Sequence, residues 1–167
     1  MILKNISNSV NKLVGIFCIC IFIVMLTSTV LQVFTRYVLN SSLSWTEELA
    51  RFTFIWITML GASIALKNKS HAAITMIIDH LPIKIRKVIF IITDLLILFF
   101  AYLMVFQGIK MGIATSHQYS PAIHIKMTYI YLSVPFAGLI IFLYKLCDLY
   151  QNIISKNYNN ESGINKL

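Results

Sequence analysis

The sequence predicts an all-α integral membrane protein with four transmembrane helices, and two observations support this fold class. Hydrophobic residues make up 58% of the 167 residues and charged residues only 12%, whereas soluble domains carry about 25% charged residues. The apolar residues also gather in four long runs, near residues 13–35, 47–66, 88–109 and 127–147. About 20 apolar residues in a helix cross a ~30 Å hydrocarbon core. The runs do not alternate as barrel strands do, so helices are predicted.

The first run, 13–35, contains no charged residue and follows Lys4 and Lys12. A secretory signal peptide starts in a similar way. This run is too long for one, however, and no A-x-A cleavage pattern follows it, so we expect a retained span. Arg36 and Tyr37 then provide the amphipathic side chains that favour a membrane interface.

A turn at residues 40–42 separates the first two spans, because Asn-Ser-Ser is typical of tight turns. Residues 44–47 then match the capping box S-x-x-E ahead of an apolar run. In this motif the Ser44 hydroxyl accepts a hydrogen bond from the amide of Glu47, and the Glu47 carboxylate reaches back to the helix start. The second helix is therefore expected to begin at Trp45.

The start of the second span carries the densest group of polar side chains, Trp45, Glu47, Glu48 and Arg51. Glu47 and Arg51 have the favoured order for an i,i+4 ion pair. Neighbouring residues on a helix point ~100° apart, so both acids cannot face Arg51, and one is expected to be free for a partner. The simpler alternative is a capped helix with a weak surface ion pair and a tryptophan in the aromatic belt.

Residues 70–81 connect spans two and three and show the apolar period of a helix. Apolar side chains recur at i, i+3, i+4 and i+7, namely at Ile74, Ile77, Ile78 and Leu81. We expect a short amphipathic helix on the cytoplasmic membrane surface, surrounded by lysines that suit anionic lipid. The residues assigned to this surface helix are His71, Ile74, Ile78 and Asp79.

The third span carries one charge, Asp94, roughly 9 Å into the membrane by helical rise. An acid at this depth is a candidate for proton transfer or Na⁺ binding. The alternative is a structural pairing with a hydroxyl, a water molecule or a basic group of a second subunit. No other span supplies a second buried carboxylate to build an ion site, so pairing is favoured.

Two features bear on helix packing. Small residues around Gly61 in the second span permit close contact between helices. Pro135, inside the fourth span, predicts a kink because proline lacks the amide hydrogen that the helix needs.

The loop of residues 112–126 is polar and is predicted to face the outside, with His117, Pro121 and His124 exposed there. The other histidines lie on the opposite side of the bilayer, so the four cannot form one metal site. No catalytic motif, cofactor motif or cysteine pattern for zinc or redox chemistry occurs. We therefore expect neither an enzyme nor a bound metal or cofactor.

Basic residues set the expected orientation. Ten of the 14 lysines and arginines lie before the first span, between the second and third, or at and after the end of the fourth. The positive-inside rule then places both termini in the cytoplasm, and no motif for nucleic acid accompanies the charge. Residues 1–150 are expected to form one four-helix domain, and the Asn-rich residues 151–167 a polar cytoplasmic tail without stable structure.

The start of the second span also resembles a known family. The order of residues is Arg36-Tyr37, then Trp45-Thr46-Glu47-Glu48-Leu49-Ala50-Arg51, followed by Trp56, Gly61-Ala62 and His71. It resembles the small membrane subunit of tripartite ATP-independent periplasmic (TRAP) transporters. The Ser120-Pro121-Ala122 segment and the proline in span four fit the same family, and the resemblance covers nearly the whole chain in length, span count and topology.

This resemblance implies a role without catalysis. In such systems a large membrane subunit of about 12 spans transports the substrate with Na⁺, and a periplasmic substrate-binding protein delivers an organic acid, often a C4-dicarboxylate or sialic acid. The small subunit is a scaffold in the bacterial inner membrane and helps to dock the binding protein. Candidate residues for partner contacts are Arg36, Trp45, Glu47, Glu48, Arg51, Trp56, Gly61 and Asp94.

A rival function remains open from the residues alone. The chain is also compatible with a small exporter or proton-coupled carrier that works as a homodimer. Such a carrier needs a carboxylate near the middle of the membrane, whereas Asp94 lies off-centre and the first span has no charge.

Overall fold

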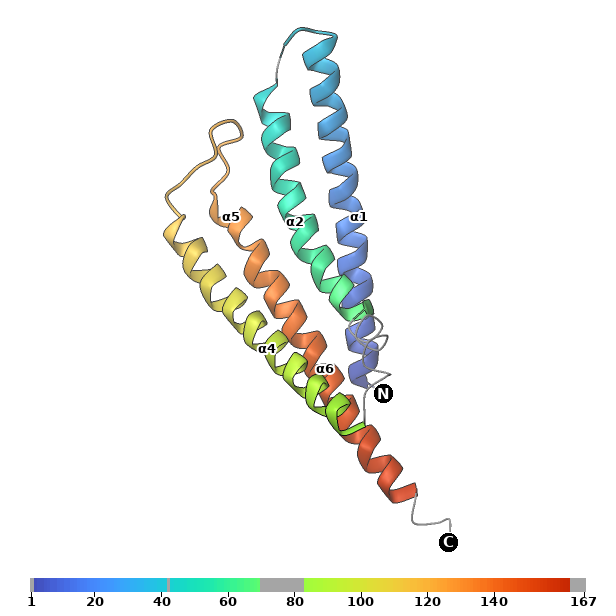
Figure 1. Ribbon diagram of the computed structural model, residues 1–167. Helices are drawn as coiled ribbons and strands as arrows, with labels where there is room; N and C mark the ends of the chain where they lie inside the picture. The colour runs from blue at the N-terminus through green and yellow to red at the C-terminus, as the bar shows by residue number, and fades with distance from the viewer. Residues whose placement is uncertain (1, 42, 70–82, 163–167) are drawn as a thin grey trace.

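The computed structural model describes residues 2–41, 43–69 and 83–162. In these ranges the chain is helical apart from its connections (Figure 1). The helices are α1 (Ile2–Tyr37), α2 (Ser44–Lys69), α4 (Ile83–Ala114), the short α5 (Thr128–Tyr131) and α6 (Ser133–Ser162). Four stretches are long and apolar enough to cross a membrane, which confirms the predicted all-α membrane fold. The predicted surface helix, with His71, Ile74, Ile78 and Asp79, lies outside the described residues.

The helices extend beyond the predicted spans. The first stretch covers Ser7–Tyr37 and the third Ile91–Ala114, so the third reaches five residues past the predicted end at Ile109. The prediction of an unstructured tail was wrong for its first part, because α6 continues to Ser162. Asparagine lowers helix propensity by less than about 0.7 kcal/mol per residue relative to alanine. No proline or glycine interrupts residues 139–162, so nothing there forces the helix to stop.

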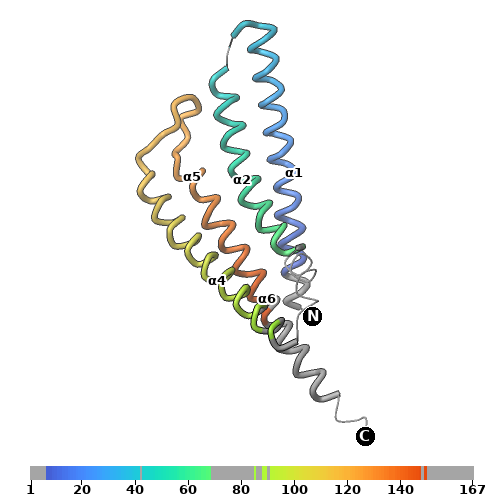
Figure 2. Tube along the Cα trace, in the orientation of Figure 1, coloured from blue at the N-terminus to red at the C-terminus, as the bar shows by residue number. Residues whose placement is uncertain are grey.

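The helices lie side by side in the order α4, α6, α2, α1. α2 and α6 form the inner pair, α1 packs mainly on α2, and α4 packs mainly on α6. Figure 2 shows the same order along the backbone trace, with the α1–α2 turn and the α4–α5 loop at one end of the molecule. We call this end the loop end. An open row leaves much of each helix without cover from the same chain.

The small core lies where α1, α2 and α6 meet. It consists of Leu60, Ile140 and Tyr144, and Trp56 packs against it. The Trp56 ring contacts Phe17 edge-on at 6.4 Å between centroids, and it contacts Phe136 at 6.1 Å. Trp56, a candidate for partner contacts, therefore packs within its own chain, although it remains half-buried.

Close contact between helices occurs at α4 and α6. A Cβ added at Gly108 would lie 2.5 Å from the Pro135 side chain, and one at Gly138 would lie 2.9 Å from the Met104 Cβ. At Gly61, by contrast, nothing lies within 4 Å. The fourth span is divided at Leu132, three residues before Pro135, and the kink itself stays a prediction.

Candidate docking site

The loop between α4 and α5 forms a compact hairpin at residues 118–127. Tyr119 and Lys126 pair as an isolated antiparallel bridge, and His124 adopts a left-handed conformation with φ 57°. Backbone hydrogen bonds close the turn, from the amides of Ser120, His124 and Met127 to the carbonyls of Ile125, Ser120 and Gln118. The polar composition predicted an exposed loop here. The structure shows in addition that backbone hydrogen bonds close this loop into a hairpin.

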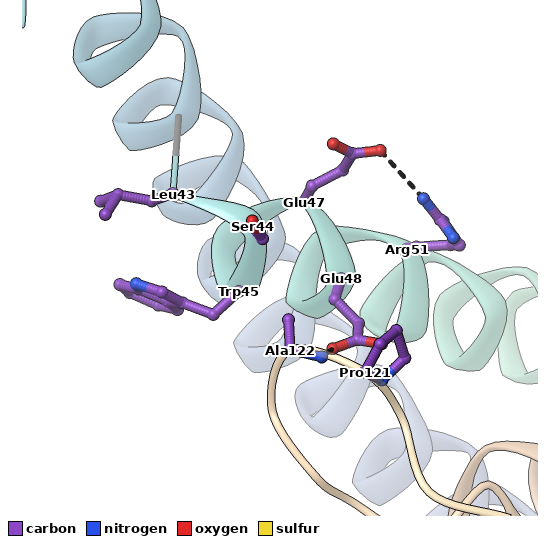
Figure 3. Close-up of a pocket in the computed structure, with 8 residues that line it drawn as sticks. All are labelled: Leu43, Ser44, Trp45, Glu47, Glu48, Arg51, Pro121 and Ala122. Atoms are coloured by element: carbon purple, nitrogen blue, oxygen red, sulfur yellow. Dashed lines mark hydrogen bonds and ion pairs between the residues drawn. The ribbon is translucent and has the colours of Figure 1, made fainter. Parts of the chain in front are cut away.

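Glu48 joins this hairpin to the start of α2. Its Oε2 accepts hydrogen bonds from the amide of Ala122 at 3.0 Å and from the amide of Ile123 at 2.8 Å, as Figure 3 shows for the carboxylate beside Ala122 and Pro121. The residue is only 7% exposed. Glu48 is separated from Ala122 by 74 residues along the chain, so the spacing of the local motif gives no signal of this contact.

The other acid, Glu47, pairs with Arg51. Arg51 donates from Nη2 to the Glu47 Oε1 at 2.9 Å, and both side chains are more than half exposed. Only Glu47 therefore faces Arg51, as predicted, and Glu48, the acid expected to be free for a partner, also contacts the hairpin through one carboxylate oxygen. The i,i+4 pairing itself was predicted.

The capping box does not form. α2 begins at Ser44, one residue earlier than predicted, and the Leu43 carbonyl accepts from both the amide and the hydroxyl of Thr46 at 3.2 Å and 2.7 Å. Glu47 turns towards Arg51 and not back to the helix start. The ion pair competes for the carboxylate that the cap requires.

A cleft of about 590 Å³ opens between α2 and the hairpin. Trp45 lies on its wall with 43% of its surface exposed. Glu47 and Arg51 line it from α2, and Pro121 lines it from the hairpin (Figure 3). The full lining is Leu43, Ser44, Trp45, Glu47, Glu48, Arg51, Pro121 and Ala122.

One face of α2 continues from this cleft along the helix. Its side chains recur at helical spacing and are all exposed. We call this face the α2 stripe, and it consists of Glu47, Arg51, Phe54, Thr58, Ala62 and Ala65. The exposed side chains of α1 and α4 are mostly large and apolar, as lipid contact favours. Apart from Phe54, the α2 stripe instead carries a charged pair, which is costly against lipid, and smaller residues, which permit close helix contact.

The α2 stripe borders an apolar groove between α2 and α4. The groove has a volume of about 620 Å³ and includes Ala62 on α2, Phe100 on α4 and Ile141 on α6. Met59, Leu66, Thr93, Leu96, Ile97, Phe99, Leu103 and Met104 complete its lining. Its dimensions fall within the range of ligand and side-chain pockets in proteins.

Asp94 has a partner in its own chain. Lys145 Nζ lies 2.6 Å from the Asp94 Oδ1, and the two side chains are 3% and 18% exposed respectively. Hydroxyls, water and a second subunit were the expected partners of this acid, and Lys145 was missed. A signal was available, because antiparallel spans place the start of the third span and the end of the fourth at the same depth.

The remaining predicted residues do not join this site. Arg36 is exposed in the last turn of α1, and His117, Pro121 and His124 are exposed on the α4–α5 connection, of which Pro121 alone lines the cleft. Within the described ranges, no three His, Cys, Asp or Glu side chains come close enough to hold a metal ion.

Comparison with known proteins gives a consistent result. Residues 25–154 match the family described as tripartite ATP-independent periplasmic transporters, DctQ component. Over 86 residues, 52% of the chain, it is 36% identical to the sialic acid TRAP transporter small permease protein SiaQ of Vibrio cholerae. Over 158 residues, 93% of the chain, it is 27% identical to the ectoine TRAP transporter small permease protein TeaB of Halomonas elongata, covering 82% of that protein.

A third relative is much longer. The chain is 39% identical over 94 residues, 54% of its length, to the isethionate TRAP transporter permease protein DctMQ of Oleidesulfovibrio alaskensis. The matched region spans 15% of that protein and 50% of SiaQ.

Proposed function

This chain belongs to the DctQ family, the small permease component of bacterial TRAP transporters, and on that premise we propose that it is the scaffold for a large transport subunit. The component is non-catalytic and spans the membrane several times. The large subunit covers the face formed by the α2 stripe and the adjoining groove. Substrate crosses the membrane through that subunit and not through this chain.

The α2 stripe is the observation that carries this proposal. Arg51 lies seven residues from the start of α2, which is about 10 Å along the helix, and its side chain is 64% exposed. A charged pair at this depth is costly against lipid and is better solvated by a protein neighbour. Ala62, Ala65 and the open space at Gly61 allow another helix to approach closely.

The length of the DctMQ relative supports a permanent association with a larger permease. The segment that matches this chain occupies 15% of a single longer permease polypeptide. A covalent link between the matching segment and the rest of the permease is useful if the two work together. This supports a large membrane subunit as a partner of this chain.

The buried ion pair supports a role without an ion path. Lys145 neutralises Asp94 inside the membrane, so this acid is not available as a carrier of protons or Na⁺ while the pair is intact. The rival function of a stand-alone carrier therefore lacks a free carboxylate at Asp94.

Further parts of the proposal concern the whole transporter. The bacterial inner membrane is the proposed location, with both termini in the cytoplasm and the loop end facing the periplasm. The hairpin, which includes His124, and the neighbouring His117 contribute to docking of a periplasmic binding protein. The transporter imports an organic acid of the C4-dicarboxylate or sialic acid class with Na⁺. Because small permease relatives serve sialic acid, ectoine and C4-dicarboxylates, substrate choice is assigned to the other chains.

Copurification with the large subunit from the same host tests the scaffold role. Ala62→Trp fills the groove beside the α2 stripe and is expected to reduce the recovered large subunit at least about tenfold. Val30→Trp places the same bulk on the exposed face of α1, where Val30 is 65% exposed, and is expected to have no effect. Equal recovery with both variants would exclude the α2 stripe as the interface.

A further inference from the structure

Within the part of the chain that the structure describes, Glu48 is a buried carboxylate without a counter-charge. The residue is 7% exposed, and a single oxygen, Oε2, accepts both amide hydrogen bonds from the hairpin. Among the described residues no cation forms an ion pair with Glu48, because the Arg51 guanidinium lies on Glu47. Oε1 accepts no hydrogen bond within the same residues. Buried charges in proteins are normally paired, and a carboxylate has about four acceptor positions.

The surroundings of this carboxylate suit a cation. Glu48 lies on the wall of the cleft of about 590 Å³, which is large enough for a long side chain. Two carboxylates and one guanidinium leave its lining with one negative charge in excess. Trp45 lines the same cleft and is 43% exposed, and the face of an indole ring is the best aromatic surface for a cation.

We propose that the cleft receives a lysine or arginine side chain of the large permease subunit. The cation forms an ion pair with the Glu48 Oε1 while its stem or guanidinium plane lies against Trp45. This inference rests on the proposed function, because Glu47 and Arg51 belong both to the cleft and to the α2 stripe. A chain that covers the α2 stripe therefore also reaches the cleft.

The same carboxylate then has two separable tasks. Oε2 fixes the hairpin through the amides of Ala122 and Ile123, and the remaining negative charge binds the partner. A neutral group of the same shape preserves the first task and abolishes the second. The side-chain amide of glutamine is such a group, since its oxygen accepts two hydrogen bonds, and the test is therefore the Glu48→Gln variant.

The experiment measures recovery of the large subunit together with hydrogen exchange of the amides in residues 118–127. Glu48→Gln is expected to retain amide protection at Ala122 and Ile123 and to lower recovery at least about tenfold. Glu48→Ala is expected to lose both the amide protection in the hairpin and the recovery of the large subunit. Val30→Trp, on the exposed face of α1 and outside both the cleft and the α2 stripe, is the control, and its recovery is expected to stay within about twofold.

Two results with variants of the cleft would overturn the inference. The first is wild-type recovery with Glu48→Gln, provided that Ala62→Trp still abolishes it, because the scaffold role would then stand without the cationic contact. The second result concerns Trp45→Leu, which decides the question if Glu48→Gln disturbs the hairpin. Trp45→Leu leaves the hairpin hydrogen bonds intact and is expected to lower recovery. Wild-type recovery with Trp45→Leu would reject the site. If the wild-type chain itself recovers no large subunit, the proposed function fails and the inference fails with it.

A photo-crosslinker at position 122 identifies the partner. Ala122 lines the cleft and is partly exposed, so a benzophenone side chain there is expected to capture the large subunit beside a lysine or arginine. Capture of the periplasmic binding protein alone would overturn the assignment of the partner.

Discussion

Glu48, which is buried, and Asp94, which is half-buried, each join distant parts of the chain, and their charges are balanced in different ways. Asp94 on α4 meets the ammonium group of Lys145 on α6, so its charge is neutralised within the chain. Glu48 on α2 accepts hydrogen bonds from the neutral amides of the hairpin, and no cation among the described residues balances its charge. A region with balanced charge is structurally complete, whereas a region with an unbalanced buried charge indicates a missing partner.

The largest loss of stability is expected when the Asp94–Lys145 ion pair is broken. Lys145→Met leaves the half-buried Asp94 without its cation, and removing one partner of a buried pair typically costs about 3–5 kcal/mol. The thermal midpoint in detergent is expected to fall by more than about 10 °C, as such a loss implies. The double variant Asp94→Asn with Lys145→Met is expected to recover most of that loss, because no unpaired charge remains. A double variant as unstable as the single one would contradict the assignment of an isolated pair.

The second prediction concerns the unbalanced region. Glu48→Ala removes two charge-assisted hydrogen bonds, each worth roughly 1.5–3 kcal/mol, but both act on the hairpin alone. Amide exchange at Ala122 and Ile123 is expected to accelerate by at least about tenfold, while exchange in the core around Leu60 stays unchanged. Faster exchange throughout α2 would indicate that Glu48 supports the whole helix pair and not only the hairpin.

A third prediction sharpens the comparison by changing the α4–α6 contact without touching any charge. Gly108→Ala places a Cβ 2.5 Å from the Pro135 side chain, so the helices must move apart, at a cost of about 1–3 kcal/mol. Gly61→Ala meets nothing within 4 Å and serves as the control. Thermal unfolding of the isolated chain is expected to be lowered by the first variant alone.

The smallest expected effect is at the exposed ion pair. Glu47→Gln breaks the contact with Arg51, whose side chain is 64% exposed. Exposed pairs contribute at most about 1 kcal/mol, so the thermal midpoint of the isolated chain should change by only a few degrees. A large loss of stability would mean that the pair is shielded from solvent and belongs to the folded core.

The elements that follow from local pattern were predictable from the sequence. Apolar length gave the four spans, and the order of Glu47 and Arg51 gave their ion pair. The contacts of Glu48 with the hairpin and of Asp94 with Lys145 were not found, because both join residues far apart in the chain. Only the arrangement of antiparallel helices brings them together. The continuation of α6 to Ser162 was missed because composition was given more weight than the lack of a helix breaker.

Transport by reconstituted vesicles tests the central claim most directly, which is that this chain supports a carrier and provides no path itself. Vesicles would contain the chain alone, the large subunit alone, or both, with the binding protein and a Na⁺ gradient supplied in each case. We expect substrate uptake only when both membrane chains are present. Uptake by vesicles that contain this chain alone would contradict the account.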